Sequence, residues 1–154
     1  MKLCLVCVGR LRKGPEKLMV DDYLDRFAKT GRGLGLPSVT ITEIDAKGAG
    51  MEAEAALIER AIPSGAVRVL LDERGTQPTS PDFARRLGAW RDGARDVALV
   101  IGGADGLAPD LRNSADLTIS FGAMVWPHML VRVMLAEQLY RAASILAGSP
   151  YHRV

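Results

Sequence analysis

The stretch Val97-Ala-Leu-Val-Ile-Gly-Gly-Ala-Asp-Gly106 decides how the rest of the sequence is interpreted. An apolar run of strand length ends at two glycines, and an acidic residue and a third glycine follow. A strand buried on both faces of a parallel sheet has such a continuous apolar run. Gly102 and Gly103 permit a sharp turn and a close approach of a ligand to the backbone. Ligands of open α/β sheets bind beyond the carboxyl ends of strands, so the sequence predicts a site here; a tight turn without a ligand is the alternative.

Apolar runs and helical patterns alternate around this stretch. Strands are expected at 2–8, 39–45, 67–72, 97–101 and 117–120, separated by helices at 15–29, 51–62, 80–90 and 107–113. This order predicts an α/β fold with a mostly parallel sheet. Ser80 and Pro81 are expected to be the N-cap and first residue of the third helix. Asp72-Glu-Arg-Gly75 is expected to form a turn at the end of the third strand.

The last third of the chain has a different pattern. Phe121-Gly-Ala-Met-Val-Trp-Pro127 is apolar but is interrupted by glycine and proline, and a helix is expected from Met129 to Leu146. This helix is apolar nearly all round, so it must be buried on more than one side, and one side is a candidate subunit interface. Its charged residues are Arg132, a candidate buried interface partner, and Glu137 and Arg141, which are spaced to pair along the helix.

Composition restricts the class of protein. The chain has 154 residues, of which 48% are hydrophobic and 25% charged, as expected for one globular domain. The net charge of +2 is too small to indicate nucleic-acid binding by itself. Cys4 and Cys7 lie three apart in an apolar strand and should point to opposite faces, so we expect buried thiols and no metal site. Neither a signal peptide nor a membrane-length apolar run is present, and a cytoplasmic location is expected.

Four motifs then occur in a fixed order: Ile101-Gly-Gly-Ala-Asp-Gly106, Trp126-Pro-His-Met-Leu-Val-Arg-Val133, Ala136-Glu-Gln-Leu-Tyr-Arg-Ala142 and Pro150-Tyr-His-Arg153. Together they resemble the small bacterial methyltransferases of the SPOUT superfamily that modify N3 of a pseudouridine in large-subunit (23S) ribosomal RNA. The resemblance covers essentially the whole chain.

The resemblance implies a single SPOUT domain over residues 1–154 with a deep trefoil knot in its C-terminal part, about residues 70–154. It also implies a homodimer, S-adenosylmethionine as methyl donor, and a substrate in the helix 69 hairpin of 23S rRNA, methylated on assembled ribosomes. The implied donor-binding residues are Leu71, Gly102, Gly103, Phe121, Gly122, Ala123, Met124, Val125 and Trp126. Apolar walls with backbone polar groups suit adenine and methionine.

The chemistry requires the proton on N3 to leave, so a general base or a group that stabilises the anion is expected. The catalytic candidates implied by the resemblance are Asp105, His128, Tyr151, His152 and Arg153. Each has an alternative role: Asp105 caps the following short helix, His128 holds the loop at a helix start, and the last residues form a frayed end. Which group takes the proton is left open.

Other functions compete with this one. A non-enzymatic, dimeric, ribosome-binding module would keep the same fold. A nucleotide-dependent oxidoreductase using Gly102 and Gly103 is disfavoured, because the glycine spacing and the late position are wrong for that fingerprint. If the substrate is RNA, exposed cations on the dimer surface are expected to contact it; the candidates are Arg10, Arg12, Lys13 and Arg32.

Overall fold

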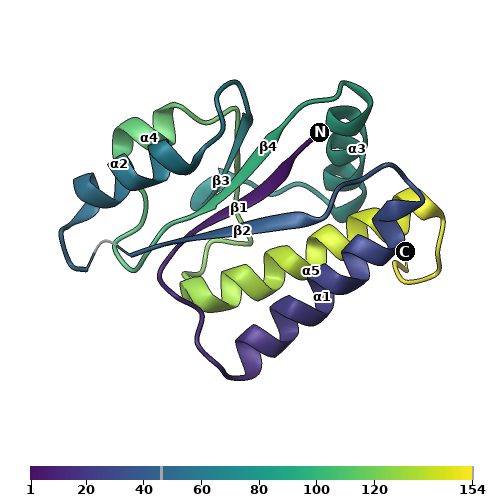
Figure 1. The fold of residues 1–154 in the computed structure, drawn as a ribbon, viewed down its shortest axis with the longest axis horizontal. Helices are drawn as coiled ribbons and strands as arrows, with labels where there is room; N and C mark the ends of the chain where they lie inside the picture. Colours follow the sequence, from purple (N-terminus) through teal and green to yellow (C-terminus); the bar gives the residue numbers. More distant parts are fainter. Residues whose placement is uncertain (46, 154) are drawn as a thin grey trace.

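Five parallel strands form the central sheet of the protein, whose computed structural model describes residues 1–45 and 47–153 (Figure 1). The order across the sheet is β2 (Val39–Ile44), β1 (Leu3–Val8), β4 (Val97–Ile101), β3 (Val67–Thr76) and β5 (Leu117–Ile119). Each neighbouring pair is parallel. The predicted α/β fold with a parallel sheet is therefore confirmed.

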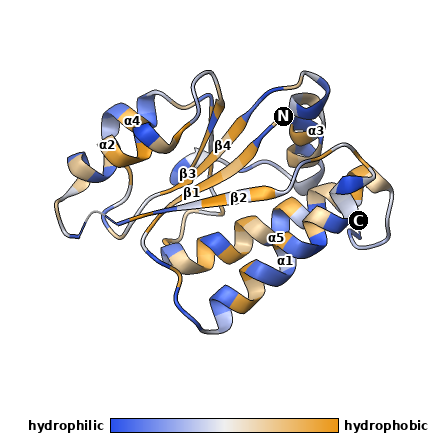
Figure 2. Ribbon diagram, in the orientation of Figure 1, coloured by the Kyte–Doolittle hydropathy of each residue, from blue (hydrophilic) through white to orange (hydrophobic). Residues whose placement is uncertain are grey.

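Helices cover both faces of the sheet. One face packs against α1 (Pro15–Arg32), α3 (Ser80–Asp92) and α5 (His128–Ala147), and the other packs against α2 (Met51–Ala61) and α4 (Pro109–Asn113). All five residues of β4 are buried, as its continuous apolar run predicts (Figure 2). Cys7 lies in the first core and Cys4 packs against the second, so the two thiols do point to opposite faces.

The last helix, α5, packs between α1 and α3 and over the sheet (Figure 1). Leu135, Leu139 and Ala143 are buried in the core, which accounts within one chain for much of the apolar surface of the helix. Arg132 is buried, but its guanidinium Nη1 contacts Glu43 Oε2 of the same chain at 2.8 Å. The hypothesis that Arg132 is a subunit-interface partner is therefore wrong.

The third strand is longer than expected, because it continues through Thr76 where a turn was predicted after Asp72. The pairing of β3 with β5 changes register between Leu71 and Thr76. Gly75 lies in this irregular segment, and a Cβ there would come within 2.6 Å of the Thr118 carbonyl carbon and oxygen. Gly75 is therefore required by the close approach of β5 and not by a turn.

The N-cap of α3 is Thr79 and not Ser80. The Thr79 hydroxyl accepts a hydrogen bond from the backbone N–H of Asp82 at 3.2 Å, and the Asp82 carboxylate accepts one from the backbone N–H of Thr79 at 3.3 Å. This reciprocal capping box satisfies two backbone donors at once, which the Ser80 hydroxyl cannot do from one position later.

Candidate functional site

A cavity of about 770 Å³ opens beyond the carboxyl ends of β3, β4 and β5. Three segments that are distant in the sequence meet there: residues 71–74 of β3, the loop 102–107 after β4, and the loop 121–127 after β5. Eight of the nine expected donor-binding residues line the cavity: Leu71, Gly102, Gly103, Phe121, Gly122, Met124, Val125 and Trp126. Ala123 belongs to the same loop and is exposed to solvent. The site expected after β4 is thus built from three strand ends.

The two glycines after β4 are required by the folding of their own loop. A Cβ on Gly102 would lie 2.9 Å from Leu107 Cδ2 and 3.1 Å from the carbonyl carbon of Gly106. The loop is closed by a hydrogen bond from the Gly106 N–H to the Gly103 carbonyl, at 3.0 Å. A Cβ on Gly103 would lie 2.8 Å from Glu54 Oε1. Close packing against α2 and Leu107, and not only ligand approach, therefore explains both glycines.

The loop after β5 begins with a local hydrogen-bond pair. The Ser120 hydroxyl donates to the Gly122 carbonyl at 2.8 Å and accepts from the Gly122 N–H at 3.0 Å, while Gly122 has a φ of +124°. The following Met124 and Val125 side chains are 76% and 79% exposed. This loop therefore leaves the sheet in a defined direction and presents apolar side chains at the cavity rim.

The lining of the cavity fits an adenosyl and methionyl group. Leu71, Ile101 and Phe121 supply apolar walls, and the glycine loops supply backbone polar groups. The cavity also contains the carboxylates Asp72 and Asp105, which sequence reasoning did not assign to the binding of a positively charged sulfonium. No binding role was predicted for Asp72, because the sequence indicated a turn at this residue. In the structure Asp72 lies in β3.

One end of the cavity contains a cluster of ionisable groups that includes Asp105 and His128. Glu54 on α2 belongs to the same neighbourhood: burial and then the charge of Asp105 raise the pKa of its carboxyl, and His128 lowers it. Glu54 was missed because an acidic residue in an amphipathic helix has no distinctive sequence pattern. α4 starts after Ala108, and no side chain among the described residues caps it, so the capping role considered for Asp105 is wrong.

The C-terminal candidates lie far from this cavity within one chain. His128 begins α5, whereas Tyr151, His152 and Arg153 follow its other end, and 20 helical residues span about 30 Å (Figure 1). Tyr151 and His152 are nevertheless held by contacts with α5. The Tyr151 hydroxyl donates to Glu137 Oε1 at 2.9 Å, and His152 Nδ1 lies 3.2 Å from Arg141 Nη1. The expected pairing of Glu137 with Arg141 is confirmed at 2.7 Å.

Two further properties concern the described residues, 1–45 and 47–153. They hold no group of three or more His, Cys, Asp or Glu side chains arranged to bind a metal ion. Their helices include none that is long and apolar enough to cross a membrane.

Comparison with known proteins gives a consistent result. The family model described as "Predicted SPOUT methyltransferase" matches residues 1–152. A protein of Cereibacter sphaeroides named ribosomal RNA large subunit methyltransferase H is 69% identical, and one of Paracoccus denitrificans with the same name is 66% identical. These alignments cover 100% and 99% of both chains, respectively.

Among solved structures, the SpoU methyltransferase AviRb of Streptomyces viridochromogenes, in complex with AdoMet, aligns with 91% of this chain and 60% of its own. Its identity is 16% and the TM-score is 0.44.

The parallel sheet, the cavity at its carboxyl edge and the family match together define a methyltransferase of the SPOUT class, which uses S-adenosylmethionine as methyl donor. Within that class, the chain belongs to the family of proteins named ribosomal RNA large subunit methyltransferase H.

Proposed function

We propose that this protein transfers a methyl group from S-adenosylmethionine to N3 of a pseudouridine in the helix 69 hairpin of 23S rRNA, and that it acts on assembled ribosomes. The substrate class is supported by full-length relatives named ribosomal RNA large subunit methyltransferase H. The observation that carries the proposal is that eight of the nine expected donor-binding residues line one cavity.

The reaction is a displacement at carbon, so positioning contributes much of the rate. The donor supplies a methyl group on a positively charged sulfur; the bond from N3 to this carbon forms as the carbon–sulfur bond breaks. Leu71, Phe121 and the loop 121–127 hold and orient the donor. The proton on N3 must pass to a base before or during this step.

Two groups in the cavity are suited to take that proton. His128 and Asp105 both line it, and the charges of both act on Glu54. An imidazole that accepts the proton becomes positively charged, and the neighbouring Glu54 and Asp105 carboxylates stabilise that charge. Substituting His128 and Asp105 one at a time distinguishes the base from the residue that stabilises its charge. The base is the residue whose loss removes the acidic limb of the pH–rate profile.

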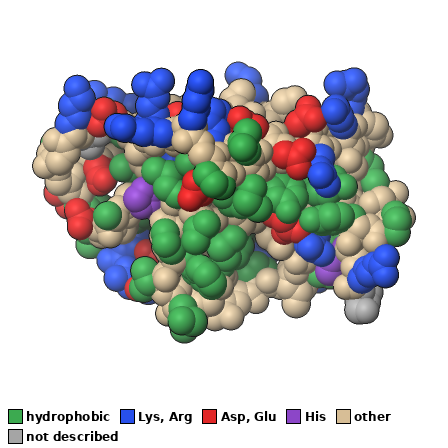
Figure 3. All heavy atoms as spheres, turned by 90° about the horizontal axis from the view of Figure 1, so that it is seen from below, with side chains coloured by type: hydrophobic (Ala, Val, Ile, Leu, Met, Phe, Trp, Pro, Cys, Tyr) green, Lys and Arg blue, Asp and Glu red, His purple; other side chains and the backbone are tan. Residues whose placement is uncertain are grey.

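The remaining catalytic candidates act across a homodimer in this proposal. Tyr151, His152 and Arg153 are too far from their own cavity and would complete the cavity of a second copy. The face formed by α1 and α5 carries gathered hydrophobic side chains that a partner would cover (Figure 3). Its large exposed apolar residues and those of the neighbouring loop 121–127 are Leu18, Met19, Leu130, Met124, Val125 and Trp126.

RNA recognition is assigned to cations near this face. Arg10, Arg12, Lys13 and Arg32 are exposed, and their charges can neutralise phosphates. The backbone N–H of Leu11, between two of these residues, donates to Glu43 Oε2 at 2.6 Å. This hydrogen bond attaches the basic loop, residues 9–14, to β2. Because the same Glu43 oxygen also pairs with Arg132, the loop cations Arg10, Arg12 and Lys13 stay near the start of α5.

The proposal also includes one domain over residues 1–154, with the chain knotted in about residues 70–154. It is supported by the convergence of β3 and of the segments after β4 and β5 on one cavity. Such threading would hold the loops 102–107 and 121–127 together.

Mixing two inactive variants tests the exchange of tails. One variant is His128→Ala, and the other lacks residues 151–154. If each tail serves the partner's cavity, co-refolded mixtures recover methyl transfer, because one of the two sites in a mixed dimer is intact. Equal inactivity of the mixture and of its components, with mixed dimers present, would contradict an exchange of tails.

A further inference from the structure

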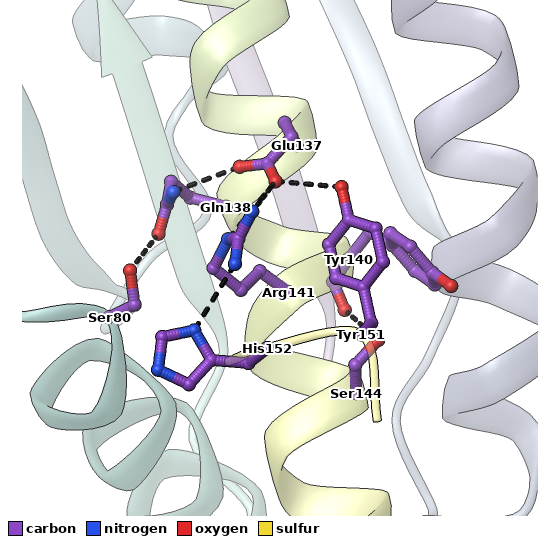
Figure 4. A network of polar contacts seen from close by, with 8 residues as sticks. All are labelled: Ser80, Glu137, Gln138, Tyr140, Arg141, Ser144, Tyr151 and His152. Atoms are coloured by element: carbon purple, nitrogen blue, oxygen red, sulfur yellow. Dashed lines mark hydrogen bonds and ion pairs between the residues drawn. The ribbon is translucent and has the colours of Figure 1, made fainter. Parts of the chain in front are cut away.

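The C-terminal tail is held by one carboxylate on α5 (Figure 4). Glu137 Oε1 accepts hydrogen bonds from the Tyr151 hydroxyl at 2.9 Å and from Arg141 Nη2 and Nε at 2.7 and 3.1 Å. Arg141 Nη1 in turn lies 3.2 Å from His152 Nδ1. Two of the three tail residues assigned to the reaction are thus connected to Glu137, Tyr151 directly and His152 through Arg141.

The Tyr151 ring is also fixed by its neighbours. Its centroid lies 4.5 Å from that of Tyr140, and the Arg141 guanidinium carbon lies 4.8 Å from it. Burial and the hydrogen bond to Glu137 raise the pKa of the Tyr151 phenol, so it stays a proton donor to the carboxylate over the whole neutral range. The position of the Tyr151 hydroxyl therefore depends on Glu137.

The second carboxylate oxygen of Glu137, Oε2, connects the tail network to Gln138 and α3. Gln138 Nε2 donates to Glu137 Oε2 at 2.9 Å, and the Ser80 hydroxyl donates to Gln138 Oε1 at 2.7 Å (Figure 4). Ser80 and Gln138 line a smaller cavity of about 250 Å³, whose walls also include Ile119 and Phe121. Because those two residues line the donor cavity as well, the network extends from the tail to a shared wall of the site.

We propose that Glu137 is a positioning residue for methyl transfer: it sets the direction in which Tyr151 and His152 leave α5, so that they meet the substrate base. This inference rests on the proposed function. The Glu137 carboxylate accepts three hydrogen bonds on one oxygen and one on the other, and these bonds restrict the rotamers of the side chains that donate them. In a protein without the Glu137 carboxylate, the tail must become ordered each time substrate binds. We expect this cost to lower turnover and to leave the cavity that binds S-adenosylmethionine unchanged.

The test compares Glu137→Ala with Glu137→Gln, which keeps an acceptor for the Tyr151 hydroxyl. Asp92→Ala is the matched control, because Asp92 pairs with Arg91 at 2.9 Å at the exposed end of α3. Three quantities are measured for each variant: kcat for methyl transfer to ribosomes, Kd for S-adenosylmethionine, and the rate at which carboxypeptidase releases the tail residues.

We expect Glu137→Ala to lower kcat at least tenfold and to speed tail release at least fivefold, with the donor Kd within twofold of wild type. Glu137→Gln should recover part of both effects, and Asp92→Ala should show neither. A Glu137→Ala protein with wild-type kcat or wild-type tail release overturns the inference, as does a parallel loss of donor binding. If wild-type protein transfers no methyl group, the proposed function fails, whereas tail release still reports on the role of Glu137.

Discussion

Arg132 of α5 and Glu43 of β2 lie 89 residues apart in the sequence and form an ion pair, with Nη1 and Oε2 separated by 2.8 Å. The Arg132 side chain is 1% exposed, and its guanidinium also donates through Nη2 to the Gly9 carbonyl at 3.1 Å. The same Glu43 oxygen accepts the backbone N–H of Leu11 at 2.6 Å. One carboxylate therefore joins the sheet, the basic loop and the start of α5, where His128 lies.

Replacing Glu43 by alanine should leave the buried Arg132 charge without its partner. We expect a loss of about 2 kcal/mol in the free energy of unfolding, below the range for fully buried pairs because Glu43 is 35% exposed. Urea denaturation at pH 7 measures this loss. Asp92→Ala, at an exposed pair, should cost less than about 0.5 kcal/mol. Equal effects of the two substitutions would show that the Arg132 pair does not join these elements.

Gly102→Ala should damage the site through its own loop. The new methyl group would meet Leu107 and the Gly106 backbone, so we expect a loss of about 1–3 kcal/mol in stability and at least tenfold weaker donor binding. Gly33→Ala is the matched control, because a Cβ at Gly33 has nothing within 4 Å and its φ is −70°. Isothermal calorimetry and thermal unfolding measure both effects. If Gly102→Ala binds S-adenosylmethionine with wild-type affinity, the loop 102–107 does not contribute to the binding site.

Glu54→Gln should change the pH dependence of methyl transfer. Burial and the charge of Asp105 raise the pKa of the Glu54 carboxyl, and the charge of His128 lowers it, so the carboxylate of Glu54 and a protonated His128 favour each other. Removing the Glu54 charge removes an interaction that favours the protonated imidazole. If His128 is the base, the acidic limb of the kcat/KM profile therefore moves to lower pH in Glu54→Gln. The profile of Asp110→Asn, at the exposed start of α4, should match wild type. An unmoved limb in Glu54→Gln would argue against His128 as the base.

Cys7 should make the protein sensitive to alkaline pH. Burial raises the pKa of its thiol from 9.0 to about 12, so the unfolded chain loses this proton first as the pH rises. The contribution of the thiol to stability is complete below pH 9 and falls by up to about 1.4 kcal/mol per pH unit toward pH 12. The free energy of unfolding should thus fall less steeply between pH 9 and 11 in Cys7→Ala than in wild type. Parallel curves would show that Cys7 ionises as easily in the folded protein.

Local patterns predicted most of the secondary structure. The continuous apolar run 97–101 is β4 with the same bounds, since a strand at the centre of a parallel sheet needs apolar residues on both faces. Thr79 was missed as the N-cap because Ser80 is an equally good capping residue by type. The Asp three positions after Thr79 is the signal that separates them.

Features that depend on contacts between distant segments were not predictable in this way. Gly75 resembles a turn glycine until β5 is placed against it, and Arg132 resembles an interface residue until β2 brings Glu43 beside it. The donor-binding set came from a resemblance in motifs that do not include Glu54. The motif 136–142 contains Glu137 and Arg141, but only their pairing with each other was predicted, and not the contacts with Tyr151 and His152. Both depend on side-chain positions in three dimensions.

The most direct test of the account is methyl transfer from labelled S-adenosylmethionine to ribosomes whose 23S rRNA lacks the modification. The site of transfer is mapped by reverse transcription, because a methyl group on N3 blocks base pairing. We predict stoichiometric labelling and one new stop at a pseudouridine in helix 69, both reduced in Gly102→Ala at S-adenosylmethionine concentrations near the wild-type Kd. Labelling at another position, or donor binding without any transfer to ribosomes or free rRNA, would contradict the account.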